Sequence, residues 1–308
     1  MTRPFARRQF LNLAAAALAC PAAVQADTGV ERHDWRGTAI GAGARITLYH
    51  PRGDELLARA RAEIDRLEDI FSLYRADSAL SRLNRDGGLA APPFELLDCL
   101  SLCARVHRAS GGLFDPSVQP LWALYAEAHN AGQAPTADQI TAVLARVGWK
   151  GVHYDSREVR LRTGMALTLN GVAQGYVADR VAVLLERAGA TRALVYTGEI
   201  RTIGAPAGRP GWSVQIDGGP KLSLSDRGLA TSAPLGTVFD AGGEVGHILH
   251  PRTGRPVPAR WRLVSVSAPR AAPADALATA GAMMPDRARL AALVGGFRGA
   301  RIEAAVPA

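Results

Sequence analysis

The sequence is poor in cysteine, with three in 308 residues. Two of them, Cys99 and Cys103, lie four residues apart in a segment of helical apolar periodicity. Two ligands do not complete a structural zinc site, which takes four. Because a free cysteine packs like a small hydrophobic side chain, we expect both in the core, and a redox role remains the alternative.

Clustered lysine is also lacking. The formal net charge of +8 comes from arginines spread thinly along the chain, without aromatic residues between them, so nucleic-acid binding is a poor interpretation. The sequence has no low-complexity segment and no repeat of fixed period, which excludes solenoids and propellers. Beyond the first residues, no apolar run reaches the roughly 20 residues that a membrane-spanning helix needs.

The N-terminus has the pattern of a twin-arginine export signal. Arg7-Arg8 precedes a short apolar stretch, and small residues lead to a cleavage site after Ala26. We therefore predict a signal peptide at 1–26, a mature domain at 27–308 and a periplasmic location. A membrane anchor is disfavoured because the apolar run is short and interrupted by Pro21. Lipid attachment at Cys20 is a less favoured alternative, because its lipobox lacks leucine at the usual position.

Helical and strand periodicities are mixed along the mature chain, which predicts the α+β class. The expected helices are 54–72, 93–109, a segment capped by Thr136, 176–188 and, as the last helix, 273–284. The expected strands are 45–50, 159–161, 194–196, 212–216 and 263–268, with hairpin connections at 204–211 and 217–220.

Four regions hold glycine or polar side chains that a structural role alone does not require. They are 71–84, 110–122, 169–179 and the pair 246–256 with 274–279. In the second region, Gly111-Gly112 lets the backbone approach a ligand, with a helix C-cap as the alternative. The third is expected to lead from a strand through glycines into a helix start, whose backbone N–H groups favour phosphate.

Asp275 and Thr279 are the most informative pair. Four residues apart on a helix, they face the same side, and both offer hard oxygen ligands of the kind that Mg²⁺ prefers. Backbone carbonyl, water and substrate phosphate would complete such a site. The alternative for Asp275 is a helix N-cap.

These stretches, in their order from Gly37-Thr38 to Thr279, resemble the ApbE-type FAD:protein FMN transferases. The most specific elements are His250 followed by Pro-Arg-Thr-Gly-Arg-Pro, and then Ala-Asp-Ala-Leu-Ala-Thr at 274–279. The resemblance implies an ApbE-like α+β fold with mixed sheets, helices packed on the sheets and one compact catalytic unit.

The resemblance also implies a site and a reaction. A threonine or serine hydroxyl of a client protein attacks the FMN-side phosphorus of FAD, AMP departs, and Mg²⁺ offsets phosphoryl charge. The implied metal ligands are Asp275, Thr279 and the Gly171 carbonyl. The implied FAD-binding residues are Tyr74, Leu113, Phe114, Asp115, Thr168, Gln174, Glu199, Ser232, His247, Ile248 and Arg252.

Two basic residues have proposed roles in this reaction. His247, with a free pKa near neutrality, is the candidate for proton transfer or phosphate positioning, and the alternative is a histidine bonded within a loop. Arg252 would pair with phosphate through its guanidinium, and the alternative is a structural salt bridge. Together with Asp275, His247 forms the predicted catalytic pair.

The chain departs from the family pattern around the flavin. Thr168 stands where the family has aspartate, Gln174 where it has lysine or an acid, and Gly198-Glu199 where it has Gly-Gly-Asp. Such a twin-arginine variant resembles the NosX-like branch that assists nitrous-oxide respiration, which implies a membrane-bound electron-transfer flavoprotein as client. Two other hypotheses follow: an FAD-binding assembly factor without catalysis, and an FAD pyrophosphatase with water as nucleophile.

Overall fold

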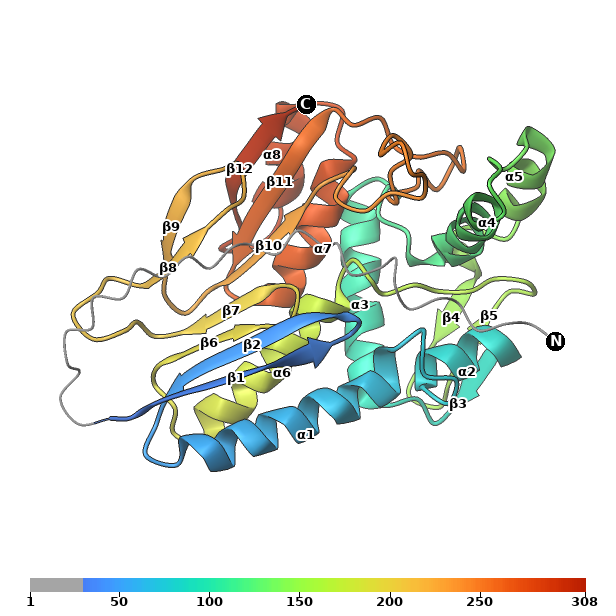
Figure 1. Ribbon diagram of the computed structural model, residues 1–308. Coiled ribbons are helices and arrows are strands. Elements are labelled where there is room, and N and C mark those ends of the chain that lie inside the picture. The colour runs from blue at the N-terminus through green and yellow to red at the C-terminus, as the bar shows by residue number, and fades with distance from the viewer. Residues whose placement is uncertain (1–29) are drawn as a thin grey trace.

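The structure is a computed structural model that describes residues 30–308 (Figure 1). The expected signal peptide and Cys20 lie outside the described residues. Within residues 30–308, none of the helices combines the length and the apolar composition needed to cross a membrane. The helices are α1 (Gly53–Phe71), α2 (Ala79–Asp86), α3 (Phe94–Ala109), α4 (Gln119–Asn130), α5 (Ala137–Leu144), α6 (Ala173–Arg187), α7 (Ala271–Ala282) and α8 (Arg287–Gly295), with the short 3₁₀ helices η1 (Pro116–Val118) and η2 (Trp149–Gly151).

A seven-stranded sheet forms the centre of the described chain, in the order β1-β2-β6-β7-β10-β11-β12. Its strands are β1 (Arg32–Ala39), β2 (Ala42–Tyr49), β6 (Ala193–Tyr196), β7 (Ile200–Ile203), β10 (Gly228–Ser232), β11 (Trp261–Ala268) and β12 (Arg301–Pro307). A smaller sheet has β3 (Gly88–Ala90), β5 (Glu158–Leu161) and β4 (Val152–Tyr154), and a hairpin has β8 (Trp212–Gln215) and β9 (Lys221–Leu224). Each of these pairings is antiparallel.

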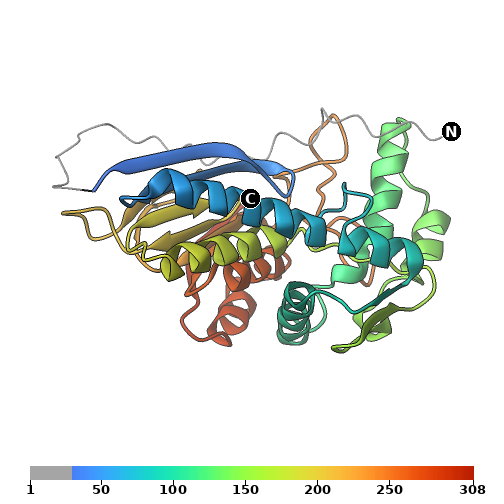
Figure 2. The ribbon, with the colours of Figure 1, turned by 90° about the horizontal axis from the view of Figure 1, so that it is seen from below.

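Helices α1, α6 and α7 cover one face of the large sheet, and the β8–β9 hairpin packs on the other (Figures 1 and 2). Strand β6 shows how the sequence separates the two faces. Its Ala193 and Val195 belong to the core under the helices, whereas Leu194 and Tyr196 pack with the hairpin. Alternation of side chains along a strand therefore gives this sheet two buried faces.

Helices α6 and α7 pack closely at their N-terminal ends. The buried carboxylate of Asp179 on α6 accepts hydrogen bonds from the backbone N–H groups of Ala271 and Ala272, at 2.7 and 2.9 Å, in the first turn of α7. It thus supplies the acceptors that a helix N-terminus needs. Gly175 lies at the crossing, where a Cβ atom would be 2.5 Å from the carbonyl oxygen of Ala271. This contact fixes the start of α6 against α7.

The structure confirms the α+β class and contains all five helices expected from the sequence, as α1, α3, α5, α6 and α7. Thr136 forms a capping box with Gln139 at the start of α5. Cys99 and Cys103 are both fully buried on α3, as expected of small core side chains. The connection at 217–220 does join the hairpin strands β8 and β9.

Three expectations were wrong. Residues 204–211 do not close a hairpin, because β7 and β8 belong to different sheets. The segment before α6 is a turn rather than a strand, since residues around 169 bond locally into the helix start. Helix 273–284 is not the last: Asp286 caps α8 by accepting from the N–H of Arg289, and β12 then returns to the sheet edge beside β11.

The α6–α7 crossing gives the first prediction. We expect Gly175→Ala to lower the free energy of unfolding by about 1–3 kcal/mol, because the added methyl group meets rigid backbone. Gly295→Ala on α8 is the matched control, since its Cβ would point into open space and alanine is the better helix former. Urea unfolding followed by circular dichroism measures both, and equal midpoints for the two variants would contradict the packing described here.

Candidate functional site

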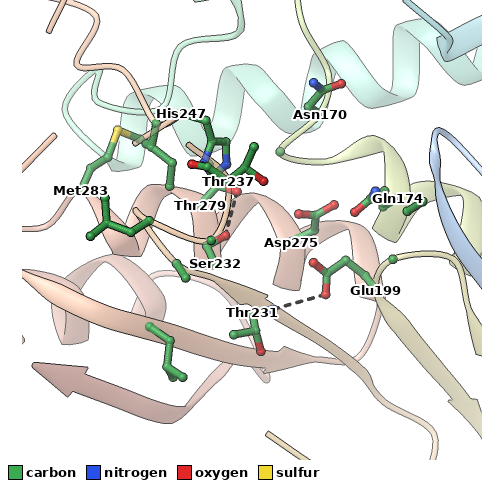
Figure 3. Close-up of a pocket in the computed structure, with 18 of the residues that line it drawn as sticks. Asn170, Gln174, Glu199, Thr231, Ser232, Thr237, His247, Asp275, Thr279 and Met283 are labelled. Atoms are coloured by element: carbon green, nitrogen blue, oxygen red, sulfur yellow. Dashed lines mark hydrogen bonds between the residues drawn. The ribbon is translucent and has the colours of Figure 1, made fainter. Parts of the chain in front are cut away.

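A cavity of about 690 Å³ opens between three segments of the described chain. They are the start of α6, the turn between β6 and β7, and the long loop 233–260. One end is polar and is lined by side chains of α6, α7, β10 and the β6–β7 turn (Figure 3). The other end runs under the β8–β9 hairpin and is apolar, with Val214, Ile216, Leu229 and Leu263 in its wall. A volume of this size is typical of sites for small molecules and cofactors.

Asp275 and Thr279 both line the polar end from successive turns of α7, as their spacing predicted (Figure 3). Asp275 does not cap its own helix, which begins four residues earlier. Its Oδ2 accepts a hydrogen bond of 3.1 Å from the N–H of Gly175 in the first turn of α6. Burial raises the pKa of this carboxyl to about 7, since a charged group loses solvation there.

Gly171 packs directly against Thr279, because a Cβ on Gly171 would lie 3.0 Å from the threonine Oγ1. The Thr279 hydroxyl also lies 3.2 Å from the Ser232 hydroxyl at the end of β10. The three residues implied as metal ligands, and Ser232 with them, therefore meet at one end of the cavity.

Glu199 adds a second carboxylate to this end. It lies in the tight turn between β6 and β7, and its Oε2 accepts a hydrogen bond of 3.2 Å from the N–H of Thr231. Burial, and then the nearby carboxylate of Asp275, raise the pKa of Glu199 well above its usual range. Figure 3 shows the two acidic groups facing each other across the polar end.

His247 lies on the loop 233–260, beside Thr237 (Figure 3). Its Nδ1 is 2.9 Å from the carbonyl oxygen of Thr237. A carbonyl can only accept, so Nδ1 carries the proton and Nε2 keeps a free lone pair. Burial lowers the pKa of the imidazole, which favours this neutral form. A neutral histidine bordering a polar cavity is suited to accept a proton from a hydroxyl group.

The cavity wall also contains most of the other residues that the resemblance implies for FAD binding. Leu113, Phe114, Asp115, Thr168, Gln174 and Ile248 all line it. The Asp115 carboxylate accepts hydrogen bonds from the N–H and the hydroxyl of Ser117, at 2.9 and 2.6 Å. It also accepts one from the N–H of Trp149 at 3.0 Å. Its carboxylate therefore mainly orders this loop.

Two predicted residues stand apart from the cavity wall. Tyr74 is two-thirds exposed and lies at the rim, where its ring is next to Gly41 of the β1–β2 turn. Arg252 does not line the cavity, and its guanidinium donates to the carbonyl oxygen of Gly111. Arg252 thus links the loop 233–260 to the Gly111-Gly112 turn, and its pairing with phosphate stays a prediction.

Sequence reasoning missed several residues of the site. Thr231 and Thr237 touch Glu199 and His247 through backbone groups, which carry no signal in side-chain type. The apolar wall under the hairpin also escaped notice, since its residues read simply as strand core. The pairs Thr231-Ser232 and Gly236-Thr237 were the signal in the sequence that could have pointed to them.

The polar end has the donor set for a hard cation. It offers two carboxylates and the hydroxyls of Thr279 and Ser232, all oxygen ligands. Residues 30–308 contain no group of three or more histidine, cysteine or acidic side chains placed to hold a metal alone. The residues therefore fit an ion such as Mg²⁺ that takes its remaining ligands from backbone, water and substrate phosphate, and not a closed zinc site.

A large cavity with oxygen ligands suited to a hard cation at one end and a neutral histidine in its wall is typical of an enzyme site. The chain belongs to the ApbE family, whose sequence profile matches residues 40–299. It is an enzyme of the transferase class, as the sequence predicted.

Curated relatives include the FAD:protein FMN transferase of Treponema pallidum, 31% identical over 277 residues that cover 78% of this chain and 75% of the relative. The enzyme of the same name from Salmonella typhimurium is 28% identical over 260 residues, covering 78% and 73%. Among solved structures, the ApbE protein of Thermotoga maritima matches 90% of this chain and 97% of its own with a TM-score of 0.79 and 24% identity. Flavin transferase ApbE from Vibrio cholerae matches 90% and 98% with a TM-score of 0.75 and 23% identity. The fold is thus that of the ApbE proteins.

Burial of Asp275 gives a prediction for the metal-free protein. An acid whose pKa is raised by folding contributes stability below its unfolded pKa near 4 and loses it as the pH rises through about 7. With a chelator present at pH 8, we therefore expect Asp275→Asn to unfold at a higher temperature than wild type, with a free energy of unfolding larger by up to ~4 kcal/mol. At pH 4 we expect the two proteins to unfold at the same temperature.

Thermal unfolding at the two pH values measures this effect. Asp138→Asn, at an exposed position in the first turn of α5, is the control and should match wild type at both. A variant that is no more stable than wild type at pH 8 would show that the Asp275 carboxylate is not strained by burial.

Proposed function

We propose that this enzyme transfers FMN from FAD to a threonine or serine hydroxyl of a client protein, releasing AMP, with Mg²⁺ bound at the polar end of its cavity. The observation that carries the proposal is the meeting of Asp275, Thr279 and Gly171 beside His247 in one cavity. The names of the relatives support FAD as the substrate and a protein as the acceptor.

The residues divide the work of this reaction between them. The start of α6 and the Gly171 turn would lie beside the dinucleotide phosphates, because the positive end of a helix dipole favours anions. The apolar end under the hairpin would hold aromatic parts of the dinucleotide away from water. Asp275, Thr279 and the Gly171 carbonyl would hold Mg²⁺, which supplies charge neutralisation at the phosphoryl oxygens when bound.

His247 would act on the acceptor hydroxyl. Its Nε2 takes the hydroxyl proton while the hydroxyl oxygen bonds to the FMN-side phosphorus. The bond between that phosphorus and the bridging oxygen then breaks, and AMP leaves with that oxygen. The Thr237 carbonyl keeps the ring in the tautomer that this step requires.

The setting of the reaction is a further part of the proposal. The twin-arginine pattern at 1–26 supports export of this enzyme to the periplasm by that route. A membrane-bound electron-transfer flavoprotein is the client that the sequence resemblance implies, and lipid attachment at Cys20 is the less favoured variant of this arrangement. The transmembrane orientation of such a client would have to present its acceptor hydroxyl to the periplasm.

Incubation of the mature protein with FAD, Mg²⁺ and a client domain known to accept FMN from another ApbE-family enzyme tests the proposal. We expect the client to gain the mass of FMN and AMP to appear in equal amount. Free FMN formed without client would instead indicate a pyrophosphatase. Binding of FAD without any product would indicate an assembly factor, and either result would reject the transferase.

Replacement of His247 gives a sharper prediction. We expect His247→Gln to lower the rate of FMN transfer by about 10²- to 10⁴-fold with little change in FAD affinity, because the variant loses only the proton acceptor. Rapid-quench mass spectrometry gives the rate, and flavin fluorescence titration gives the affinity. His153→Gln, at an exposed position on β4, is the matched control and should transfer at the wild-type rate. Near-normal transfer by His247→Gln would assign the proton to another group.

A further inference from the structure

The turn between β6 and β7 brings Glu199 to the polar end of the cavity, opposite Asp275 (Figure 3). We infer that Glu199 is a direct ligand of the bound divalent cation, so that the ion lies between two carboxylates that come from the sheet and from α7. This inference rests on the proposed function, because it concerns the metal of that same site.

The backbone around Glu199 is fixed from two sides. The hydroxyl of Thr197 donates to the carbonyl oxygen of Gln174 at 2.8 Å, and the N–H of Thr197 donates to the carbonyl of Glu199 at 3.0 Å. Gly198, with φ of +97°, lies so close to Gln174 that a Cβ would be 2.3 Å from the amide carbon of that side chain. The turn is therefore locked onto α6, and the Glu199 side chain extends into the cavity.

The partners of Glu199 leave room for a cation. One oxygen, Oε2, accepts from the N–H of Thr231, and that single neutral bond does not balance a carboxylate charge. Within residues 30–308, no ion pair to a basic side chain is formed by either Glu199 or Asp275. Among the described residues that line the cavity, Arg262 is the single arginine or lysine. Its guanidinium donates to the carbonyl oxygen of Gly218 in the hairpin turn and not to either carboxylate.

Two facing carboxylates without a counter-ion repel each other strongly in a poorly solvated site. A divalent cation between them replaces this repulsion with two attractions and cancels both charges. The neighbouring hydroxyls of Thr279 and Ser232 add neutral oxygen ligands of the right kind. The geometry thus uses both acids at once, whereas a metal held by Asp275 alone would leave Glu199 uncompensated.

Binding of Mn²⁺ without FAD tests this inference, with electron paramagnetic resonance reporting free and bound ion. We expect Glu199→Gln and Asp275→Asn each to weaken Mn²⁺ binding by more than about a hundredfold, because losing an outer-shell partner alone costs about ten- to a hundredfold. Glu127→Gln, at an exposed position on α4, is the matched control and should bind as wild type does. Circular dichroism in chelator confirms that each variant is folded.

A second variant of Glu199 tests whether this residue is a direct ligand of the ion or only a charge near it. Because a thiolate prefers soft ions, Glu199→Cys should bind Cd²⁺ more tightly than wild type while losing Mn²⁺ affinity. Unchanged Mn²⁺ binding in Glu199→Gln, or no gain of Cd²⁺ affinity in Glu199→Cys, overturns the inference. If wild type itself binds neither Mn²⁺ nor Mg²⁺, the metal dependence of the proposed function fails as well, which is a distinct result.

Discussion

The contact between the starts of α6 and α7 is the constraint on which the site depends. Gly175 allows the two backbones to approach, and Asp179 and Asp275 then satisfy N–H groups across the crossing. A helix start buried without such acceptors would be costly, so the same bonds that stabilise the packing also set the position of Asp275. The same few bonds therefore stabilise the packing of the two helices and hold Asp275 at the polar end of the cavity.

The charge of the cavity follows from that arrangement. Burial raises the pKa of both Asp275 and Glu199, which shows that the ionised site is unfavourable on its own. Under the proposed function a bound cation would offset this cost, because a ligand that binds only the folded state stabilises it. Strongly perturbed carboxyl groups in a cavity are typical of functional sites.

The sequence predicted the parts of this structure that depend on local pattern. Helical periodicity gave α1, α3 and α6, and the four-residue spacing of Asp275 and Thr279 correctly placed both on one face of α7. It could not give features that depend on distant backbone, such as the bond from Thr231 to Glu199 or the Thr237 carbonyl that sets the tautomer of His247. Nor could it give the bond from Arg252 to the Gly111 carbonyl, because that glycine lies 141 residues earlier in the chain.

The departures from the family pattern converge in space although they are scattered in sequence. Gln174 packs its amide against Gly198, directly beside Glu199, and Thr168 lines the same cavity. A neutral side chain at position 174 puts no charge next to this turn, and Glu199 stands where the family pattern also has an acid. A dinucleotide diphosphate is itself anionic and could approach two carboxylates only across a cation. The proposed metal would meet this need, because neither Thr168 nor Gln174 is among its implied ligands.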